Sequence, residues 1–439
     1  MSLINNPNLS KNNFLNLLLA LFPISFIAGN TIINLNIIFL IISTLLFYGR
    51  KSFKLKYYTL DKLIIVFFIF VIFTGIYNDI KFYVHDLYPK GINTTIKSIF
   101  FLKYLLLYLI LRFLIENALV NLKFFFATCS FFTLFVCLDI FYQFKFGVDI
   151  FGYETIEGLR KLGGPFGDEY IAGGYIQRYF LFSFFLIPLY FKNQKTFLRL
   201  LIPILFIIYL VGIILSGNRM PFVLFIFLIG LIFLFQKQVR KYFLTFLILT
   251  SIFFSLIYNS NEKIKNNFHN FYERAYLIIE LTFKRDFSNP NSPQYLNEFV
   301  TFYDTWLMNK YIGGGIKNFR WYCHHREPGI YAKEGFICNM HPHNYYLEIL
   351  TETGIIGFAL VLSIFIITLY LSFYKKYFSK SSLNDNNVII PFIFLFIVEI
   401  FPFKSTGSFF TTGNTTYLFL IFGILIAICR KNNSIENKS

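Results

Sequence analysis

Long apolar runs separated by short polar connections dominate this sequence and restrict the folds that are open to it. Hydrophobic residues make up 56% of the 439 positions, and charged residues only 14%. A soluble domain of this length cannot bury so much apolar sequence, so we expect an all-α polytopic membrane protein. Twelve runs are long enough, or nearly so, to span a bilayer: 14–29, 32–48, 63–77, 98–111, 124–142, 173–191, 200–216, 220–235, 242–258, 355–373, 388–403 and 416–429.

The net charge of +17 follows from where the basic residues fall between these runs. With a cytoplasmic N-terminus, most Lys and Arg of the connections lie on the cytoplasmic side, and the opposite orientation would invert this bias. The sequence therefore predicts cytoplasmic N and C termini and requires no nucleic-acid partner. The first run lacks a small-residue cleavage site and is predicted to be an uncleaved span.

This orientation divides the chain into four parts. Residues 1–258 contain spans one to nine, 259–354 form a large outer loop, and 355–430 contain spans ten to twelve. Residues 431–439 form a polar cytoplasmic tail that is predicted to be disordered. A second outer loop, 143–172, ends in GGPFGDEYIAGG.

The segment HPHNYYLEILTETG at 341–354 lies where the large outer loop meets the tenth span. Asn344 is a good N-cap and Gly354 a good C-terminal stop, which predicts a short helix between them. Its apolar and acidic residues fall on separate faces, as in a helix that lies at the membrane interface. His343 directly precedes this helix, at the end where an anion would bind and where the pKa of an imidazole falls.

Few ionisable residues occur within the spans, and with this topology all of them lie toward the outer face. Intramembrane charges are candidates for function, and an ion path would need them throughout the depth of the bilayer, so their one-sided distribution favours a site at the outer surface. Lys103 and Lys404 could instead extend to lipid headgroups. Mutual pairing is the alternative for the Asp139 and Arg178 side chains. The full set is Lys103, Asp139, Arg178 and Glu399, with Arg219 and Lys404 at span ends.

Arg219 lies in SGNRMP, between two spans with almost no loop. Gly217 allows a tight turn and Pro221 suits the first turn of the next helix, so the guanidinium is held near a helix N-terminus. A guanidinium in that position can bind a diphosphate through two parallel hydrogen bonds. An anchor to lipid phosphate is the alternative.

The large outer loop concentrates histidine and cysteine. A disulfide between Cys323 and Cys338 suits an oxidising compartment, and the short loop that it closes would contribute about 3 kcal/mol at most. A metal site is a second possibility, although the spacing matches no standard zinc pattern. Two free thiols are the third. The loop's histidines are His324, His325, His341 and His343.

Two further groups of polar residues on the outer side are candidates for substrate binding. A tight turn at Gly313–Gly315 is followed by Lys317 and Arg320, and it is not a phosphate loop because no Gly-Lys-Ser/Thr follows. Asp168 and Glu169 are adjacent acids at the mouth of the sixth span. They could orient an arginine or contact sugar hydroxyls, or they could belong to a solvated turn.

Taken together, the twelve spans, the large outer loop, SGNRMP, GGGIKNF and HPHNYYLEILTETGIIGF resemble the O-antigen ligase and polymerase superfamily. The motif evidence lies mainly in residues 216–221 and 313–358. The resemblance implies a GT-C-like, metal-independent enzyme without a cofactor. It also implies transfer of a glycan from an undecaprenyl-diphosphate carrier on the periplasmic face of the inner membrane.

By this resemblance Arg219 matches the family's membrane-edge arginine and His343 its loop histidine, and both are predicted to be catalytic. Arginines would offset the charge of the leaving diphosphate, and the imidazole would take the proton of the acceptor hydroxyl. The family's loop arginine has no counterpart just before the glycine turn, and Arg320 is favoured for its role over Arg274 and Arg285. Residues expected to bind diphosphate or glycan are Arg320, Lys317, Asn344, Arg178, Asp168 and Glu169.

The acceptor distinguishes the two activities within this superfamily. A ligase would transfer O-antigen to lipid A-core, which we favour on the overall motif pattern, whereas a polymerase would extend another lipid-linked repeat. A flippase for lipid-linked glycan should show halves related by a repeat and broken helices at the midplane, and the sequence shows neither. A structural scaffold would need no histidine or arginine at the interface. The expected partners are therefore the carrier lipid, the acceptor and membrane lipids.

Overall fold

The computed structural model describes residues 7–84, 93–155, 161–190, 195–237, 240–260, 262–284, 286, 293–325, 338, 342–405 and 407–436. The regular elements of this part of the chain are helices, with one isolated β-bridge between Val148 and Glu154. The α-helices are α1 (Pro7–Ala20), α2 (Phe22–Ala28), α3 (Asn30–Tyr48), α4 (Thr59–Val84), α5 (Asn93–Glu116), α6 (Leu122–Phe146), α7 (Ala172–Tyr190), α8 (Lys195–Leu215), α9 (Arg219–Phe235), α10 (Arg240–Ser260), α11 (Glu262–Lys284), α12 (Gln294–Leu307), α13 (Phe319–Tyr322), α14 (Tyr345–Leu369), α15 (Lys375–Tyr377), α16 (Ile390–Glu399) and α17 (Thr412–Glu436).

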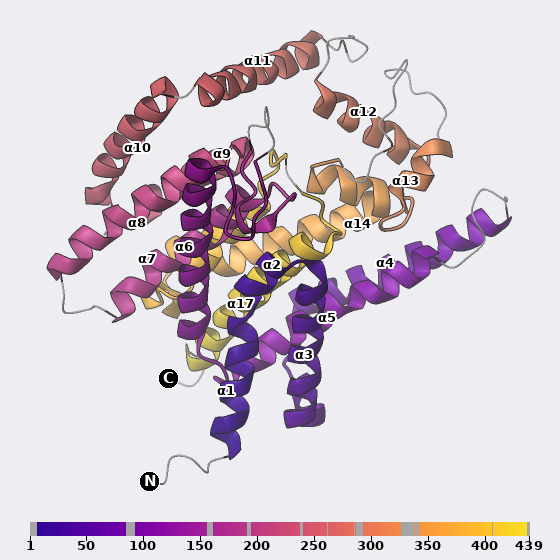
Figure 1. The fold of residues 1–439 in the computed structure, drawn as a ribbon. Helices are drawn as coiled ribbons and strands as arrows, with labels where there is room; N and C mark the ends of the chain where they lie inside the picture. The colour runs from indigo at the N-terminus through magenta and orange to yellow at the C-terminus, as the bar shows by residue number, and fades with distance from the viewer. Residues whose placement is uncertain are drawn as a thin grey trace.

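The helices form a bundle with an arch above it. α10 and α11 make the arch, and α12 continues from it toward α13 and α14 (Figure 1). Both termini lie at the opposite, lower end of the molecule (Figure 1). Within the bundle α17 packs along α5, and α6 packs along α7. The large loop of the sequence analysis is therefore itself mostly helical.

The structure confirms an all-helical protein with several helices suited to a membrane. Six helices of the described chain are long and apolar enough to cross one, and a bent pair, Ser10–Ala20 with Phe22–Ala28, would make a seventh. A helix lies at each of the twelve predicted runs. The count of twelve spans is not established, because some of these helices are short. With 10 residues, α16 is about 15 Å long, half the thickness of a bilayer core.

Two predicted helix ends differ from the structure. α17 continues through Glu436, so the tail predicted to be disordered from Lys431 is helical up to that residue. The guanidinium of Arg430 lies over the ring of Tyr58, 3.8 Å from its centroid, and fastens this part of α17 to the start of α4. Gly354 bends its helix without ending it, so the predicted short helix is the first segment of α14.

The break at Gly354 is filled by the glycine turn at 309–315. Gly354 has φ +64° and ψ −172°, which interrupts the helical hydrogen bonds on both sides of it. The turn donates to carbonyls before the break and accepts from N–H groups after it, so the groups that a broken helix leaves without partners are satisfied. The N–H groups of Gly314 and Gly315 donate to the carbonyls of Thr351 and Glu352 at 3.0 and 2.8 Å. The N–H groups of Ile355 and Ile356 donate to the carbonyls of Lys310 and Tyr311 at 2.8 and 3.4 Å.

Close approach of two backbones makes glycine necessary at Gly313 and Gly354. A Cβ on Gly354 would lie 2.2 Å from the carbonyl oxygen of Tyr311, and one on Gly313 would lie 2.5 Å from backbone atoms of Glu352 and Gly354. Both residues also have positive φ, where side chains are strained. The N–H of Gly313 donates to Asn309, so this turn binds the protein's own backbone rather than an anion.

Alanine at Gly354 or Gly313 should therefore destabilise the protein strongly. The left-handed conformation alone costs about 1–2 kcal/mol, and the backbone overlap adds to it. Gly230→Ala is the matched control, since a Cβ there meets no atom within 4 Å. Melting temperatures in detergent, measured by fluorescence-detected size-exclusion chromatography, should fall for the first two variants and not for the control. Wild-type melting of Gly354→Ala would contradict the docking of the turn.

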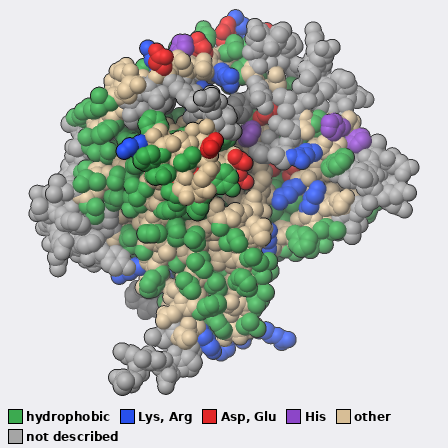
Figure 2. Space-filling view, in the orientation of Figure 1, with side chains coloured by type: hydrophobic (Ala, Val, Ile, Leu, Met, Phe, Trp, Pro, Cys, Tyr) green, Lys and Arg blue, Asp and Glu red, His purple; other side chains and the backbone are tan. Residues whose placement is uncertain are grey.

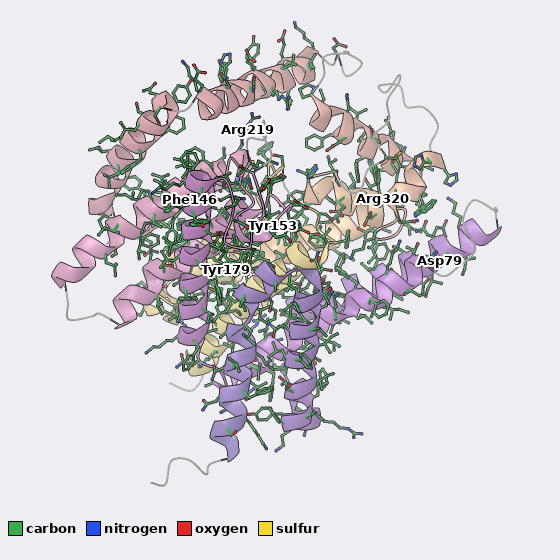
Figure 3. All side chains as sticks on the ribbon, viewed as in Figure 1. Asp79, Phe146, Tyr153, Tyr179, Arg219 and Arg320 are labelled. Carbon is green, nitrogen blue, oxygen red and sulfur yellow. A yellow bond between two sulfur atoms is a disulfide. The ribbon has the colours of Figure 1, made fainter. Side chains whose placement is uncertain are left out.

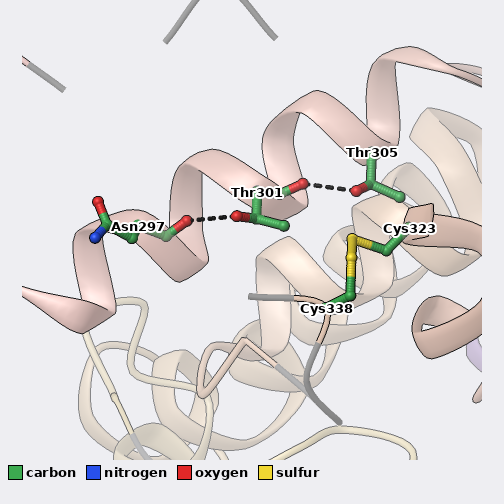
Figure 4. Close-up of a disulfide and its surroundings, with 5 residues drawn as sticks. All are labelled: Asn297, Thr301, Thr305, Cys323 and Cys338. Atoms are coloured by element: carbon green, nitrogen blue, oxygen red, sulfur yellow. Dashed lines mark hydrogen bonds between the residues drawn. A yellow bond between two sulfur atoms is a disulfide. The ribbon is translucent and has the colours of Figure 1, made fainter. Parts of the chain in front are cut away.

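A small core and a disulfide hold the outer helices against α14. The rings of Phe302 in α12 and Phe319 in α13 stack with their centroids 3.5 Å apart, and Leu347 packs beside them. Of the three alternatives for the two loop cysteines, the structure contains the disulfide between Cys323 and Cys338, with 5.7 Å between the Cα atoms (Figure 4). The other cysteines, Cys129, Cys137 and Cys429, are buried, as expected for packing residues.

Reducing the disulfide, or replacing both cysteines by Cys323→Ser and Cys338→Ser, should weaken the packing of α12 and α13 against α14. The bridge spans 15 residues, and closing a loop of that size stabilises a fold by about 3 kcal/mol. A thiol-reactive maleimide should label neither cysteine in the unreduced, denatured protein and both after reduction, as read by mass spectrometry. Labelling of both cysteines before reduction would show that the disulfide does not form.

Candidate functional site

His343 stands immediately before α14 in a backbone conformation that few residues other than glycine adopt, with φ +52°. The next residue, Asn344, caps the helix through Oδ1, which accepts from the N–H groups of Tyr346 and Leu347 at 3.0 and 3.1 Å. Its Nδ2 donates to the carbonyl of Pro402 at 2.8 Å. The Asn344 amide, predicted to bind substrate, thus holds the start of α14 against the α16–α17 connection and supports the strained residue before it.

The surroundings of His343 favour a neutral imidazole. The side chain is half-buried, and this burial lowers its pKa below the ordinary value of 6.5. The positive charge of Lys161 lowers this pKa further. The sequence predicted the lower pKa from the helix N-terminus alone, whereas the causes found here are burial and a lysine from another loop. A neutral ring can accept a proton, as a general base must.

Arg219 is the first residue of α9, as the SGNRMP turn predicts. The turn is closed by two bonds: Ser216 Oγ donates to Ile213 O at 2.7 Å, and Asn218 Nδ2 donates to Ser216 O at 3.1 Å. Arg219 lies at the upper end of the bundle, below the arch (Figure 3). The space-filling view shows a hollow in this region, edged by acidic, basic and histidine side chains (Figure 2).

A single loop segment connects the surroundings of Arg219 with those of His343. The N–H of Leu162 donates to the carbonyl of Ser216 at 3.2 Å, in the turn that leads into α9. The preceding residue, Lys161, supplies the charge that acts on His343. Residues from three distant parts of the sequence therefore converge here. Lys161 could not be identified from the sequence, since a lysine in a polar loop carries no signal until the position of that loop is known.

Arg178 pairs with Glu399 at 2.9 Å and not with Asp139, the pairing that the sequence offered as the alternative to substrate binding. Lys404 Nζ binds the same carboxylate at 2.6 Å, so the prediction that Lys404 extends to lipid headgroups is wrong. The hydroxyl of Tyr345 donates to Glu399 as well. This buried network ties α7, α16 and the first residue of α14 together, directly beside the Asn344 cap. The network fixes the start of α14, directly after His343, and it pairs charges that would be costly to bury alone.

Two further intramembrane residues have structural partners. Asp139 Oδ1 accepts from the N–H of Ile150 at 2.9 Å, which joins α6 to the loop after it. Lys103 Nζ donates to Asn34 Oδ1 at 2.5 Å, so it binds α3 rather than a headgroup.

The acids predicted to contact sugar are Asp168 and Glu169. Both are exposed and lie between the short helix Gly164–Phe166 and α7. They follow directly on the segment that carries Lys161. Exposure leaves them accessible to a polar ligand, although their position is equally that of a solvated turn.

Arg320 lies on a different part of the surface from Arg219. Arg320 is exposed on α13, and Figure 3 places it well apart from Arg219. Lys317 is exposed too, and its backbone carbonyl accepts from Lys97 Nζ at 2.9 Å. The structure therefore does not bring Arg320 to the Arg219 site as a second cation. Arg274 is exposed on α11, and Arg285 lies outside the described residues.

Glu348 and Glu352, predicted to form an acidic face at the interface, are both buried. Glu348 accepts from Ser408 Oγ and the N–H of Phe409, and Glu352 accepts from the N–H of Lys317 at 2.7 Å. These carboxylates bind backbone and hydroxyl donors of the two connections beside α14. Among the described residues no group of three or more His, Cys, Asp or Glu could hold a metal ion.

Comparison with known proteins bears on this arrangement. No curated protein matches the chain. Residues 204–362 match the family model of the O-antigen ligase domain, and the matched segment contains both Arg219 and His343. This match supports the assignment of the chain to the O-antigen ligase-like superfamily, which the sequence motifs resemble.

Proposed function

We propose that this protein transfers a glycan from an undecaprenyl-diphosphate carrier to a sugar of lipid A-core, as an O-antigen ligase of the inner membrane with its active site facing the periplasm. The observation that carries the proposal is the convergence at residues 161–162. This segment contacts the turn of Arg219 and carries the charge that acts on His343. Both residues fall in the segment that matches the O-antigen ligase domain.

Arg219 would stabilise the leaving diphosphate. Its guanidinium is always charged and can donate two parallel hydrogen bonds to phosphate oxygens. As the bond from the anomeric carbon to the diphosphate oxygen breaks, the electron pair leaves with the diphosphate. Negative charge grows on that oxygen, so a fixed cation lowers the barrier more than it stabilises the bound donor.

His343 would act as the general base. The acceptor hydroxyl oxygen forms the new bond to the anomeric carbon, and its proton passes to the neutral imidazole. A lowered pKa keeps this ring unprotonated at neutral pH, and the strained backbone holds it at the start of α14. The half-buried position also limits competition from water.

Arg219→Ala and His343→Ala should insert and fold normally but lose glycan transfer. Removing a fixed donor to a developing charge costs about 10²–10³-fold in rate, and removing a general base costs about 10²–10⁴-fold. The matched controls are Arg50→Ala and His269→Ala, whose side chains are exposed on other elements.

The measurement is the lipopolysaccharide gel pattern of a deletion strain complemented with each variant. A ligase deletion should lack capped core altogether, and only the controls should restore it. A single-repeat cap in the deletion strain would instead indicate a polymerase. Surface glycan at wild-type level from either alanine variant would refute the proposed roles.

The pH dependence of transfer should reflect the lowered pKa of His343. A base acts only when unprotonated, so kcat/KM should decline as the pH falls, with the midpoint of the decline below pH 6.5, the ordinary pKa of an imidazole. Transfer in membrane vesicles buffered between pH 5 and 8 tests this. The slow residual activity of His343→Gln should lack the acidic decline. A wild-type decline centred above pH 7 would exclude this histidine as the base.

A further inference from the structure

The segment 162–173 docks at both of its ends on the SGN turn that precedes α9. At its start, the N–H of Leu162 donates to the carbonyl of Ser216 at 3.2 Å. At its end, the first turn of α7 packs so closely on the SGN turn that a Cβ on Gly173 would lie 2.4 Å from Ser216 Oγ. The residues between these two contacts are therefore held beside the backbone that leads into Arg219.

The middle of this segment is fixed against α6 and α7. The N–H of Gly164 donates to Gln143 Oε1 in α6 at 2.9 Å. The ring of Phe166 packs against that of Tyr175 in α7, with 5.5 Å between the centroids. The two residues that follow the next glycine are thus carried by a backbone with attachments on three sides.

Those two residues are Asp168 and Glu169. Both are exposed, and in the part of the chain that the structure describes neither carboxylate has a hydrogen-bond or ion-pair partner. Carboxylates beside a site for diphosphate would repel the phosphates themselves. They can accept hydrogen bonds from the hydroxyls of a sugar, which suits the glycan part of the same donor.

The aromatic ring of Tyr153 lies beside these acids. A Cβ on Gly167 would be 3.1 Å from Cζ of this ring and 3.2 Å from each of its Cε atoms, so the ring presents a flat face to Gly167. Tyr153 nevertheless remains 51% exposed, so with one face covered the other is open to solvent. Figure 3 places Tyr153 below Arg219.

A short hairpin holds this ring in position. The N–H of Tyr153 donates to Asp149 Oδ1 at 2.8 Å, and the N–H of Asp149 donates to the carbonyl of Tyr153 at 3.0 Å. The isolated β-bridge between Val148 and Glu154 closes the hairpin around them. The open face of the ring is therefore preorganised, which lowers the entropic cost of binding a ligand there.

We propose that Tyr153, Asp168 and Glu169 form a binding subsite for the donor glycan, at the sugars nearest the diphosphate. The ring would stack on the apolar C–H face of a sugar, and the carboxylates at its edge would accept from the hydroxyls. The position beside the Arg219 turn favours the donor over the acceptor. This inference rests on the proposed glycan transfer and adds the residues that recognise the sugar.

Tyr153→Leu tests the stacking, since leucine keeps an apolar contact with Gly167 but has no ring. Tyr153→Phe is the conservative variant. The matched control is Phe151→Ala, which removes an aromatic residue that is 62% exposed on the same hairpin. The probe is the polysaccharide released by mild acid from the lipopolysaccharide of the source strain.

Binding of this probe to the purified protein in nanodiscs is measured by saturation-transfer-difference NMR. Tyr153→Leu should weaken binding about three- to tenfold, because a stacked ring is lost. Tyr153→Phe and Phe151→Ala should bind as the wild type does. Since the free polysaccharide cannot be transferred, this measurement does not depend on activity.

Asp168→Asn and Glu169→Gln test the hydrogen bonds. Each variant removes the charge and keeps the shape of the side chain, and loss of a charge-assisted hydrogen bond should weaken binding about tenfold. Glu154→Gln, an exposed acid on the hairpin, is the matched control and should bind as the wild type does. Because Asp168 and Glu169 are exposed, their variants should fold even if Tyr153→Leu does not.

Transfer kinetics identify the molecule that the subsite holds. With the donor varied, Tyr153→Leu should raise KM, and with the acceptor varied KM should stay at the wild-type value. A rise that is confined to the KM of the acceptor would assign the subsite to the acceptor and overturn the proposal.

These outcomes are distinguishable from failure of the proposed function. Wild-type affinity for the polysaccharide in Tyr153→Leu and in the double variant Asp168→Asn with Glu169→Gln would overturn the subsite and leave glycan transfer intact. Full transfer by His343→Ala would instead remove the proposed mechanism, whatever the polysaccharide binding shows.

Discussion

The mutual docking of the glycine turn and the broken helix α14 is the constraint on which the rest of this architecture depends. A helix that breaks within an apolar environment leaves carbonyls and N–H groups without partners, and each such group is costly to bury. Here both sets are satisfied by one turn, so α14 can bend without exposing its backbone. The bend separates a segment that carries the candidate site from one that is apolar enough to cross a membrane.

The first segment of α14 is then fixed at several points. Asn344 binds the α16–α17 connection, Glu348 binds the same connection further along, and Glu352 binds Lys317, two residues after the glycine turn. The Glu399 network adds a fourth attachment through Tyr345. These contacts use almost every polar side chain of the segment for its own support. His343 lies just outside the helix, and its strained backbone is tolerated because its neighbours are held so tightly.

The basic residues discussed here fall into two groups with different surroundings. Arg178, which is half-buried, and Lys404, which is buried, share the carboxylate of Glu399 and have a structural role. Arg219 and Lys161 lie at the turn and the loop that meet below the arch.

The sequence predicted the features that depend on interactions between residues close together along the chain. Apolar runs of span length predicted the helices, Asn344 its cap, and the SGN turn the place of Arg219 at the start of α9. Each depends on residues within a few positions of one another, so the sequence alone contains the answer. The partners and surroundings of the charged side chains were predicted poorly. Pairing with Asp139 was an alternative for Arg178, which pairs with Glu399. The glutamates of α14 were expected on one face of an interfacial helix and are buried, and Arg320 was favoured as the second cation of a site from which it lies apart.

The sequence by itself determined that the chain is helical, apolar enough for a membrane, and equipped with a histidine and an arginine at helix starts. Tertiary structure decided which charges meet. A buried ion pair such as Arg178–Glu399 forms only where the folded backbone brings opposite charges within a few ångströms. The charge of Lys161 acts on His343 for the same reason, although the two residues are far apart along the chain. Lys161 joins the candidate site only because Leu162 docks on the turn before Arg219, a contact between backbones that no side-chain pattern encodes.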